Sequence, residues 1–230
     1  MEVIYRDAAL LAINKPSGML THPGWARAET TALSVARSLA GQWVYPVHRL
    51  DRATSGVLLF GLDSETAGRV AKQFANGTVR KTYLALVRGI PPDSGTVDHP
   101  IPRQEGGERV DAVTEFRRLG TFERYALIEA RPMTGRLHQV RRHMKHISHP
   151  IIGDTTYGKG EHNRLFRQRF ALHRLALHAA RLELDHPDDG TRLVLEARLP
   201  DDLAKPLERL GFSDAVLSGA ATGASPTPRP

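Results

Sequence analysis

The first part of the chain alternates short apolar runs with turn-forming residues. Runs at 3–5 and 10–13 predict two strands, and the polar pair between them predicts the turn of a hairpin. A longer run, residues 57–60, is apolar throughout and follows a Thr-Ser-Gly turn at 54–56. An unbroken apolar run of this length is typical of a buried strand. The pattern therefore predicts an early sheet with one strand in its interior.

Apolar residues at helical spacing predict several helices. Thr30 or Thr31 can cap a helix over 32–39, and Ser64 is expected to cap a helix that ends near Phe74. Leu137, Val140, Met144 and Ile147 also recur at helical spacing, and further helices are expected at 161–170 and 200–210.

The second half of the chain contains consecutive strands with no helix between them. Strands are predicted at 112–118 and 125–131, joined by 119–122, and a closing pair is predicted at 176–184 and 192–197. Such runs indicate an α+β fold with a mixed, mainly antiparallel central sheet and flanking helices. The sequence has no GxGxxG or P-loop pattern, so a nucleotide cofactor is not expected.

Composition narrows the classes of partner and chemistry. The 230 residues include 32 Lys and Arg against 25 Asp and Glu, which gives a net charge of +7 and favours a polyanion, either nucleic acid or an acidic membrane surface. The absence of cysteine excludes disulfides, thiolate metal sites and cysteine nucleophiles. No apolar run approaches the ~20 residues of a membrane helix, and the charged N-terminus does not read as a signal peptide. We therefore expect a cytoplasmic protein.

One carboxylate has an unusual local environment. Asp51 lies between Arg49 and Arg52, directly before the turn and the buried strand. Neighbouring cations favour the ionised form of a carboxylate, and an ionised carboxylate on a loop held by a rigid strand can act as a nucleophile. The alternative is a salt-bridged surface loop, because such pairs are common on protein surfaces.

A second stretch, residues 133–146, combines the predicted apolar face with many cations. Arg141 lies at the edge of that face and is expected to point partly inward. Histidines at 138, 143, 146 and 149 raise the possibility of a metal site, but the stretch has no HExxH pattern and no carboxylate ligand. A basic segment that faces phosphate is the better interpretation, and no metal is expected.

Five motifs occur in an order that resembles the RluA-type pseudouridine synthases. They are residues 14–18 (Asn-Lys-Pro-Ser-Gly), 48–51 (His-Arg-Leu-Asp) with 54–56 (Thr-Ser-Gly), 81–83 (Lys-Thr-Tyr), 134–141 (Thr-Gly-Arg-Leu-His-Gln-Val-Arg) and 149–154 (His-Pro-Ile-Ile-Gly-Asp). The resemblance covers nearly the whole chain up to the tail. The basic segment 162–167, with Gly24-Trp25, is most similar to the TruC branch, which modifies tRNA.

The resemblance implies an isomerase that detaches the uracil of a uridine in RNA and rejoins it through C5, with no cofactor or metal. Asp51 matches the family's nucleophilic aspartate, Arg141 the arginine that pairs with it, and Tyr83 the tyrosine that lies against the target base. Attack at C1′, attack at C6 and assistance to a glycal route all remain open for Asp51. Val140 matches the apolar residue under the uracil, and Arg49 the arginine that fills the space left by the flipped base.

The resemblance also sets expectations for the substrate and the chain as a whole. Arg136 and His138 are expected to bind substrate, Lys15 is interpreted as structural, and Arg52 has no assigned role. The expected partner is tRNA, at the uridine numbered 65, with ribosomal RNA as the alternative, and the protein is expected to be a monomer. Residues 1–212 are expected to form one catalytic domain and 213–230 a disordered tail. A silent RNA-binding protein and a glycosidic hydrolase are the two other classes.

Overall fold

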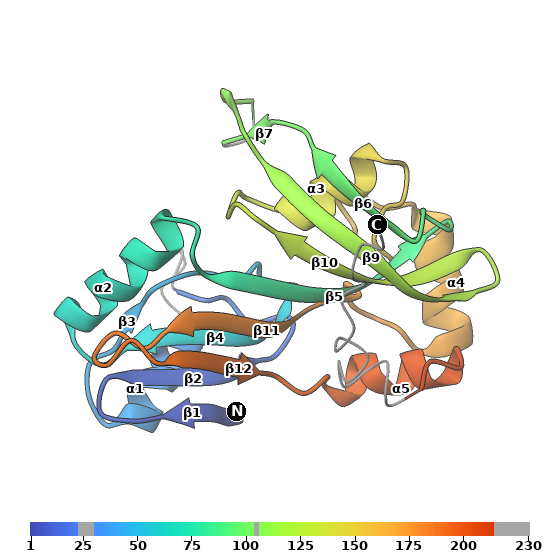
Figure 1. The fold of residues 1–230 in the computed structure, drawn as a ribbon. Helices are drawn as coiled ribbons and strands as arrows, with labels where there is room; N and C mark the ends of the chain where they lie inside the picture. Colours follow the sequence, from blue (N-terminus) through green and yellow to red (C-terminus); the bar gives the residue numbers. More distant parts are fainter. Residues whose placement is uncertain (23–29, 104–105, 214–230) are drawn as a thin grey trace, which may run out of the picture.

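A single ten-stranded sheet runs through the protein (Figure 1), in a computed structural model that describes residues 1–22, 30–103 and 106–213. Its order is β1-β2-β4-β11-β5-β10-β9-β6, with β3 beside β4 and β12 beside β11, and a separate small hairpin pairs β7 with β8. The strands are β1 (Val3–Arg6), β2 (Leu10–Lys15), β3 (Tyr45–Pro46), β4 (Ser55–Gly61), β5 (Arg80–Arg88), β6 (Ser94–Asp98), β7 (Ile101–Pro102), β8 (Arg109–Val110), β9 (Val113–Phe122), β10 (Tyr125–Pro132), β11 (Leu177–Asp185) and β12 (Arg192–Glu196).

The sheet is mixed and mainly antiparallel, as the sequence predicts. Among the strands that the structure describes, only β4 and β11 pair in parallel, through His178 with Ser55 and Ala179 with Gly56. Gly56 is required at this crossing: its φ is +120°, and a Cβ there would lie 2.1 Å from the carbonyl oxygen of Ala179. The predicted buried strand is confirmed, because every residue of β4 is buried. This strand fixes the end of the loop that carries Asp51.

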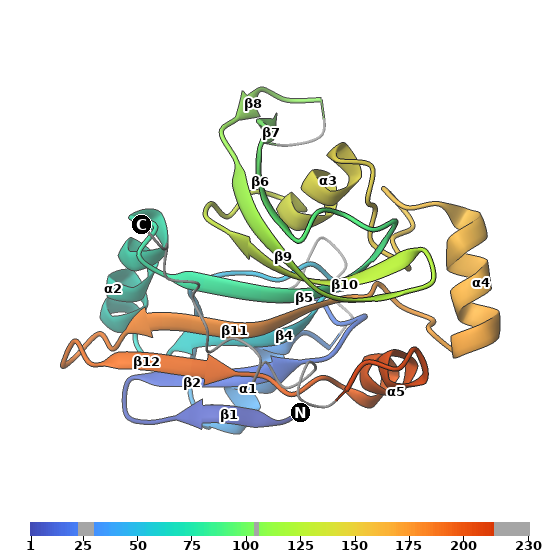
Figure 2. The same ribbon diagram turned by 45° about the vertical axis from the view of Figure 1, so that its right-hand side comes forward.

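Five helices flank the sheet in the described residues (Figures 1 and 2). They are α1 (Ala32–Ala40), α2 (Ser64–Ala75), α3 (Gln139–His146), α4 (Gly160–Phe170) and α5 (Asp201–Arg209). Thr31 caps α1 as expected, and its hydroxyl accepts a hydrogen bond from the Ser34 amide. The predicted cap of α2 is wrong. The Asp63 carboxylate accepts from the Thr66 amide, so Ser64 is the first helical residue.

Three boundaries differ from the sequence prediction. Strand β9 continues to Phe122, and the hairpin turns at Glu123, whose φ is +49°. The pairing of β9 with β10 shifts register between Leu127 and Ile128, and β9 continues past this bulge through residues 119–122, which were expected to join the two strands. Helix α3 begins only at Gln139, because the residues before it form a turn. Pro200 caps α5 rather than starting it.

The sheet joins two parts of the molecule. One part consists of β1, β2, β4, β11 and β12 with α1 and α2, and the other of β10, β9 and β6 with α3 and α4, while β5 pairs with both β11 and β10 (Figures 1 and 2). Within the described residues, no helix is long and apolar enough to cross a membrane. The expected disordered tail lies, apart from Ser213, outside the described residues, as does the Gly24-Trp25 pair.

Candidate active site

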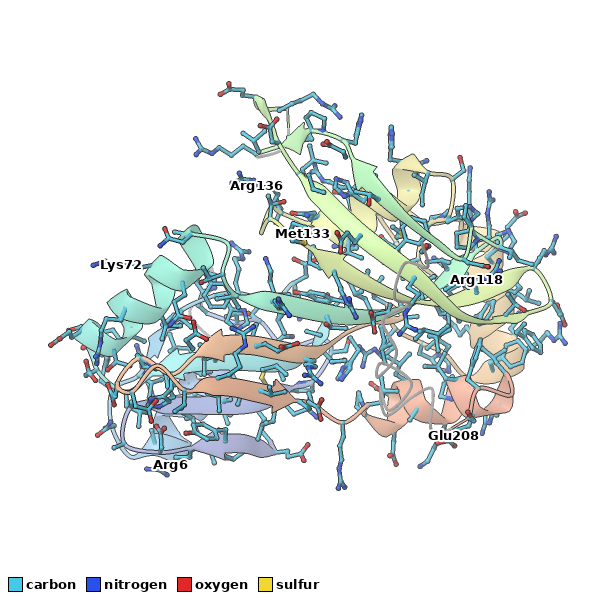
Figure 3. All side chains as sticks on the ribbon, viewed as in Figure 1. Arg6, Lys72, Arg118, Met133, Arg136 and Glu208 are labelled. Atoms are coloured by element: carbon cyan, nitrogen blue, oxygen red, sulfur yellow. The ribbon has the colours of Figure 1, made fainter. Side chains whose placement is uncertain are left out.

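The central cleft is a cavity of about 660 Å³ between the two parts of the molecule. Its walls come from the loop before β4, the end of α2, β5, and the turn that leads into α3. Met133 and Arg136 lie on the rim that faces α2 (Figure 3). All seven predicted site residues line this cavity: Arg49, Asp51, Tyr83, Arg136, His138, Val140 and Arg141. Motifs that lie far apart in the sequence therefore meet at one site.

The residues at the end of β2 and in the turn after it hold the Asp51 loop in place through hydrogen bonds. Lys15 is fully buried, and its ammonium group donates to the carbonyl oxygens of Pro16, Met19 and Arg52 at 2.9, 2.8 and 3.3 Å. Burial lowers the pKa of Lys15 to about 8. The Thr21 hydroxyl adds a bond of 2.9 Å to the Leu50 carbonyl. The interpretation of Lys15 as structural fits these contacts, because one side chain ties together two loops.

Arg141 is the charge partner of Asp51. Its Nη1 lies 3.2 Å from Asp51 Oδ2, although the two residues are ninety positions apart. Its other edge forms a bidentate pair with Asp154, with Nε at 2.7 Å and Nη2 at 3.0 Å from the two carboxylate oxygens. Burial opposes the positive charge, but the hydrogen bonds and charges of Asp154 and Asp51 outweigh it and raise the Arg141 pKa. Arg141 therefore stays cationic while it is buried.

Tyr83 and Val140 form the floor near the carboxylate. Tyr83 is a half-buried residue of β5, and burial followed by the charge of Asp51 raises its pKa. Its phenol therefore stays protonated at neutral pH and can donate a proton or a hydrogen bond. Val140 is 5% exposed and lies in the first turn of α3, next to Arg141. The two side chains give the cavity an apolar surface beside the charged pair, which suits a flat base.

The other predicted site residues, Arg49, Arg136 and His138, differ in their exposure and in the number of their contacts. Arg49 is exposed at the mouth and makes no hydrogen bond with the described residues. Arg136 is exposed, and its Nε donates to the Asp111 carbonyl at 3.2 Å. His138 is half-buried, with Nε2 3.8 Å from Asp51 Oδ2. Arg52, which has no assigned role, donates from Nε to the Gly18 carbonyl at 2.9 Å and so supports the loop.

The other histidines of the basic stretch have separate structural contacts. His143 is buried between the Thr114 hydroxyl at 2.8 Å and the His99 carbonyl at 3.0 Å. His146 stacks on His99 with ring centroids 3.6 Å apart, and His149 Nδ1 lies 2.9 Å from the Arg88 carbonyl. In the part of the chain that the structure describes, no three His, Asp or Glu side chains are grouped to hold a metal ion.

Two contributors to the site were missed by the sequence prediction. Asp154 is completely buried and accepts from the Thr156 and Tyr157 amides as well as from Arg141. Burial alone would raise its pKa, but the bonds from Arg141 and these amides lower it. Tyr157 packs its ring under the Arg141 guanidinium at 5.0 Å. The Gly-Asp at the end of the fifth motif could have indicated Asp154, but no sequence pattern pointed to Tyr157.

Comparisons with known proteins place the chain in a family. The family of the RNA pseudouridylate synthases matches residues 9–146. A protein of Vibrio cholerae named tRNA pseudouridine synthase C is 41% identical over 96% of this chain and 100% of its own length. A protein of Salmonella typhimurium with the same name is 40% identical over 92% of this chain and 90% of its length.

Solved structures agree with this assignment. Human RNA Pseudouridylate Synthase Domain Containing 4 is 29% identical, has a TM-score of 0.76, and matches over 91% of this chain and 92% of its own. Human RNA Pseudouridylate Synthase Domain Containing 1 is 26% identical with a TM-score of 0.71, over 92% and 94% of the two chains. The fold and the cleft therefore define an isomerase of uridine in RNA. The chain belongs to the RNA pseudouridylate synthase family.

Proposed function

We propose that this protein converts a uridine of tRNA into pseudouridine, with Asp51 as its reacting carboxylate. The observation that carries the proposal is the contact between Arg141 Nη1 and Asp51 Oδ2 at 3.2 Å, at the wall of a cavity large enough for a nucleoside. A carboxylate that is paired with one donor and 19% exposed remains available to a ligand. The names of the relatives favour tRNA as the substrate. Uridine 65, the position expected from the sequence resemblance, is consistent with those names.

The reaction needs groups that the cavity supplies. The N1–C1′ bond of the uridine breaks, a C5–C1′ bond forms, and the hydrogen on C5 is lost as a proton while N1 gains one. Asp51 can bond to C1′ or to C6, or assist elimination of the base, and Arg141 Nη1 donates to its Oδ2. Tyr83, which burial keeps protonated, would lie against the base and could move a proton.

The substrate-binding roles follow from exposure and polarity. Val140 would support the apolar face of the uracil, and the exposed Arg49 would enter the duplex where the flipped base has left. Arg136 and His138, on the turn before α3, would contact the flipped nucleotide. Because one chain supplies every wall of the cavity, we propose that the protein acts as a monomer, with residues 1–212 as one catalytic domain.

The proposal is tested by mapping pseudouridine in RNA from a strain that lacks this protein and from the strain complemented with it. We expect one tRNA position to lose and regain pseudouridine, whereas loss at a ribosomal position would contradict the tRNA assignment. Purified protein should then modify a tRNA transcript with uridine at position 65. A matched transcript with cytidine there, and with its pairing partner changed to guanosine, should remain unmodified.

A further inference from the structure

Three polar side chains form a hydrogen-bonded chain that ends beside the Asp51 carboxylate. Arg142 Nε lies 2.9 Å from the Tyr157 hydroxyl oxygen, and that oxygen lies 3.1 Å from His138 Nδ1. The opposite nitrogen of the same ring, His138 Nε2, lies 3.8 Å from Asp51 Oδ2. The side chains of His138, Arg142 and Tyr157 are all half-buried.

The chemistry of these groups determines where the protons lie. A guanidinium can only donate, so the Tyr157 oxygen accepts from Arg142. The Tyr157 proton then has His138 Nδ1 as its acceptor, which leaves the imidazole proton on Nε2. The reverse tautomer would leave the Tyr157 proton without an acceptor among the described residues and would turn the Nε2 lone pair toward a carboxylate. Among the described residues, the Nε2–H tautomer is the one that gives both the Tyr157 proton and the imidazole proton an acceptor.

The backbone holds the imidazole in this position. His138 precedes α3 with φ +55° and ψ 28°, a left-handed conformation that is uncommon for a residue other than glycine and costs free energy. The neighbouring Gln139 carboxamide fixes the turn, because its oxygen accepts from the Arg136 amide at 3.0 Å and from the Thr134 hydroxyl at 2.7 Å. The His138 and Tyr157 rings meet edge to face, with centroids 5.7 Å apart.

We propose that Arg142 and Tyr157 fix His138 as the neutral Nε2–H tautomer and that this N–H is a second donor to Asp51 Oδ2, alongside Arg141. This role rests on the proposed function, because it assumes that Asp51 is the reacting group. At 3.8 Å the contact is longer than a hydrogen bond, and catalytic contacts of this kind commonly shorten when substrate binds. His138 is thereby a positioning residue for the carboxylate.

The arrangement distinguishes the two oxygens of Asp51. Both donors, Arg141 Nη1 and His138 Nε2, approach Oδ2. No hydrogen bond from residues 1–22, 30–103 or 106–213 reaches Oδ1. The inference therefore assigns Oδ1 as the oxygen that reacts. The neutral state of His138 is consistent with its lowered pKa, since burial and the charges of Arg141 and Arg142 outweigh the opposing charges of Asp51 and Asp154.

The tautomer is measured directly by NMR of the free protein labelled with nitrogen-15 in histidine. The His138 signals are assigned by their loss in His138→Gln. We expect the pattern of a neutral ring protonated on Nε2 at pH 7. A ring protonated on Nδ1, or on both nitrogens, would overturn the proposal. In Tyr157→Phe, which keeps the aromatic ring, the two nitrogen shifts should move toward a mixture of tautomers, and unchanged shifts would remove Tyr157 from the proposal.

Kinetics test what the N–H contributes. A glutamine amide can place its N–H near the position of Nε2, whereas a shorter asparagine amide corresponds to Nδ1. We therefore expect His138→Gln to retain about tenfold more kcat than His138→Asn, with similar KM for RNA. A merely structural role would not favour glutamine, so equal rates would contradict the proposal. Tyr157→Phe should lower kcat about tenfold. The control Tyr45→Phe, whose hydroxyl has no hydrogen bond to the described residues, should not.

The two proposals fail in different ways. If the wild-type protein forms no pseudouridine in any tRNA or ribosomal RNA, the proposed function is wrong, and the NMR pattern still decides the tautomer. If the wild-type protein is active but the ring carries its proton on Nδ1, the proposed function stands and the positioning role of His138 is wrong.

Discussion

The turn that carries Asp51 and the turn that carries Asp154 use the same arginine for different purposes. Beside each turn, a glycine lies close to the backbone at or just before the start of β11: Gly56, in β4, lies against Ala179, and Gly153 lies against Arg174. Both carboxylates contact the Arg141 guanidinium. The two turns are therefore fixed by similar close approaches to one segment of the chain.

The difference between the turns lies in how completely each carboxylate is satisfied. The Asp154 side chain has no exposed surface and accepts two bonds from Arg141 and one from each of two amides. The Asp51 side chain is 19% exposed and accepts one hydrogen bond from the described part of the chain, the one from Arg141. A buried carboxylate with a full set of hydrogen bonds stabilises the fold. A carboxylate at a cavity wall with few hydrogen bonds can react. The comparison predicts separate effects on stability and on turnover.

The largest effect on turnover is expected for Asp51→Asn. We expect a loss of about 10³-fold or more, because the amide cannot act as a nucleophile. The melting temperature and the affinity for tRNA should remain near those of the wild type, since the carboxylate contributes little to packing. Turnover is measured by the release of tritium from tRNA labelled at C5 of uridine. The exposed surface carboxylate Asp188, changed to Asn, provides the control and should leave turnover unchanged.

Arg141→Lys is expected to lower turnover by about 10²-fold, because a single ammonium cannot contact both carboxylates with the geometry of a guanidinium. It should also lower the free energy of unfolding, measured with urea, because Asp154 loses a bidentate partner. A variant that is destabilised yet fully active would show that Arg141 does not serve Asp51.

Asp154→Asn should affect stability more than chemistry. The change removes the bidentate carboxylate partner of the buried Arg141 and leaves only Asp51 beside its charge, so we expect the free energy of unfolding to fall by about 3–5 kcal/mol. Turnover of the remaining folded protein should fall only about tenfold, because Arg141 keeps its contact with Asp51. A loss of stability below about 1 kcal/mol would contradict the structural role assigned to Asp154.

The smallest effect is a difference in acid sensitivity. The folded-state pKa of Asp154 is lowered, so its contribution to stability is complete above the unfolded pKa of about 4 and is lost as pH falls through the folded pKa. The free energy of unfolding of the wild type should therefore fall more steeply below pH 4 than that of Asp154→Asn. The excess slope should approach about 1.4 kcal/mol per pH unit. Parallel curves would show that this carboxylate is not stabilised in its ionised form.

Much of the fold could be predicted because it depends on local patterns. The apolar run at 57–60 became the buried strand β4, and the threonine before 32–39 capped α1. Where the prediction of a helix cap failed, a neighbouring residue caps the helix in place of the expected one. Asp63 rather than Ser64 caps α2, because its carboxylate reaches the Thr66 amide. Boundaries of this kind depend on which of two polar side chains has the better geometry.

The contacts of the candidate site likewise include some that the sequence predicted and some that it did not. The pairing of Asp51 with Arg141 was expected from the family resemblance and is present in the structure. The second partner of Arg141, Asp154, depends on how the chain folds back after α3, which periodicity does not describe. Tyr157 was also missed, because its contacts with Arg142 and His138 exist only when the turn after Asp154 packs on α3.

The central claim is that the protein isomerises uridine in RNA, and it is tested most directly by counting products in one reaction. Wild-type protein is incubated with tRNA labelled with tritium at C5 of uridine, and tritium release, pseudouridine content and RNA mass are measured together. We predict one tritium released per pseudouridine formed, with no change in RNA mass beyond the exchanged hydrogen. Loss of a uracil from the RNA, which leaves an abasic site, would contradict the account.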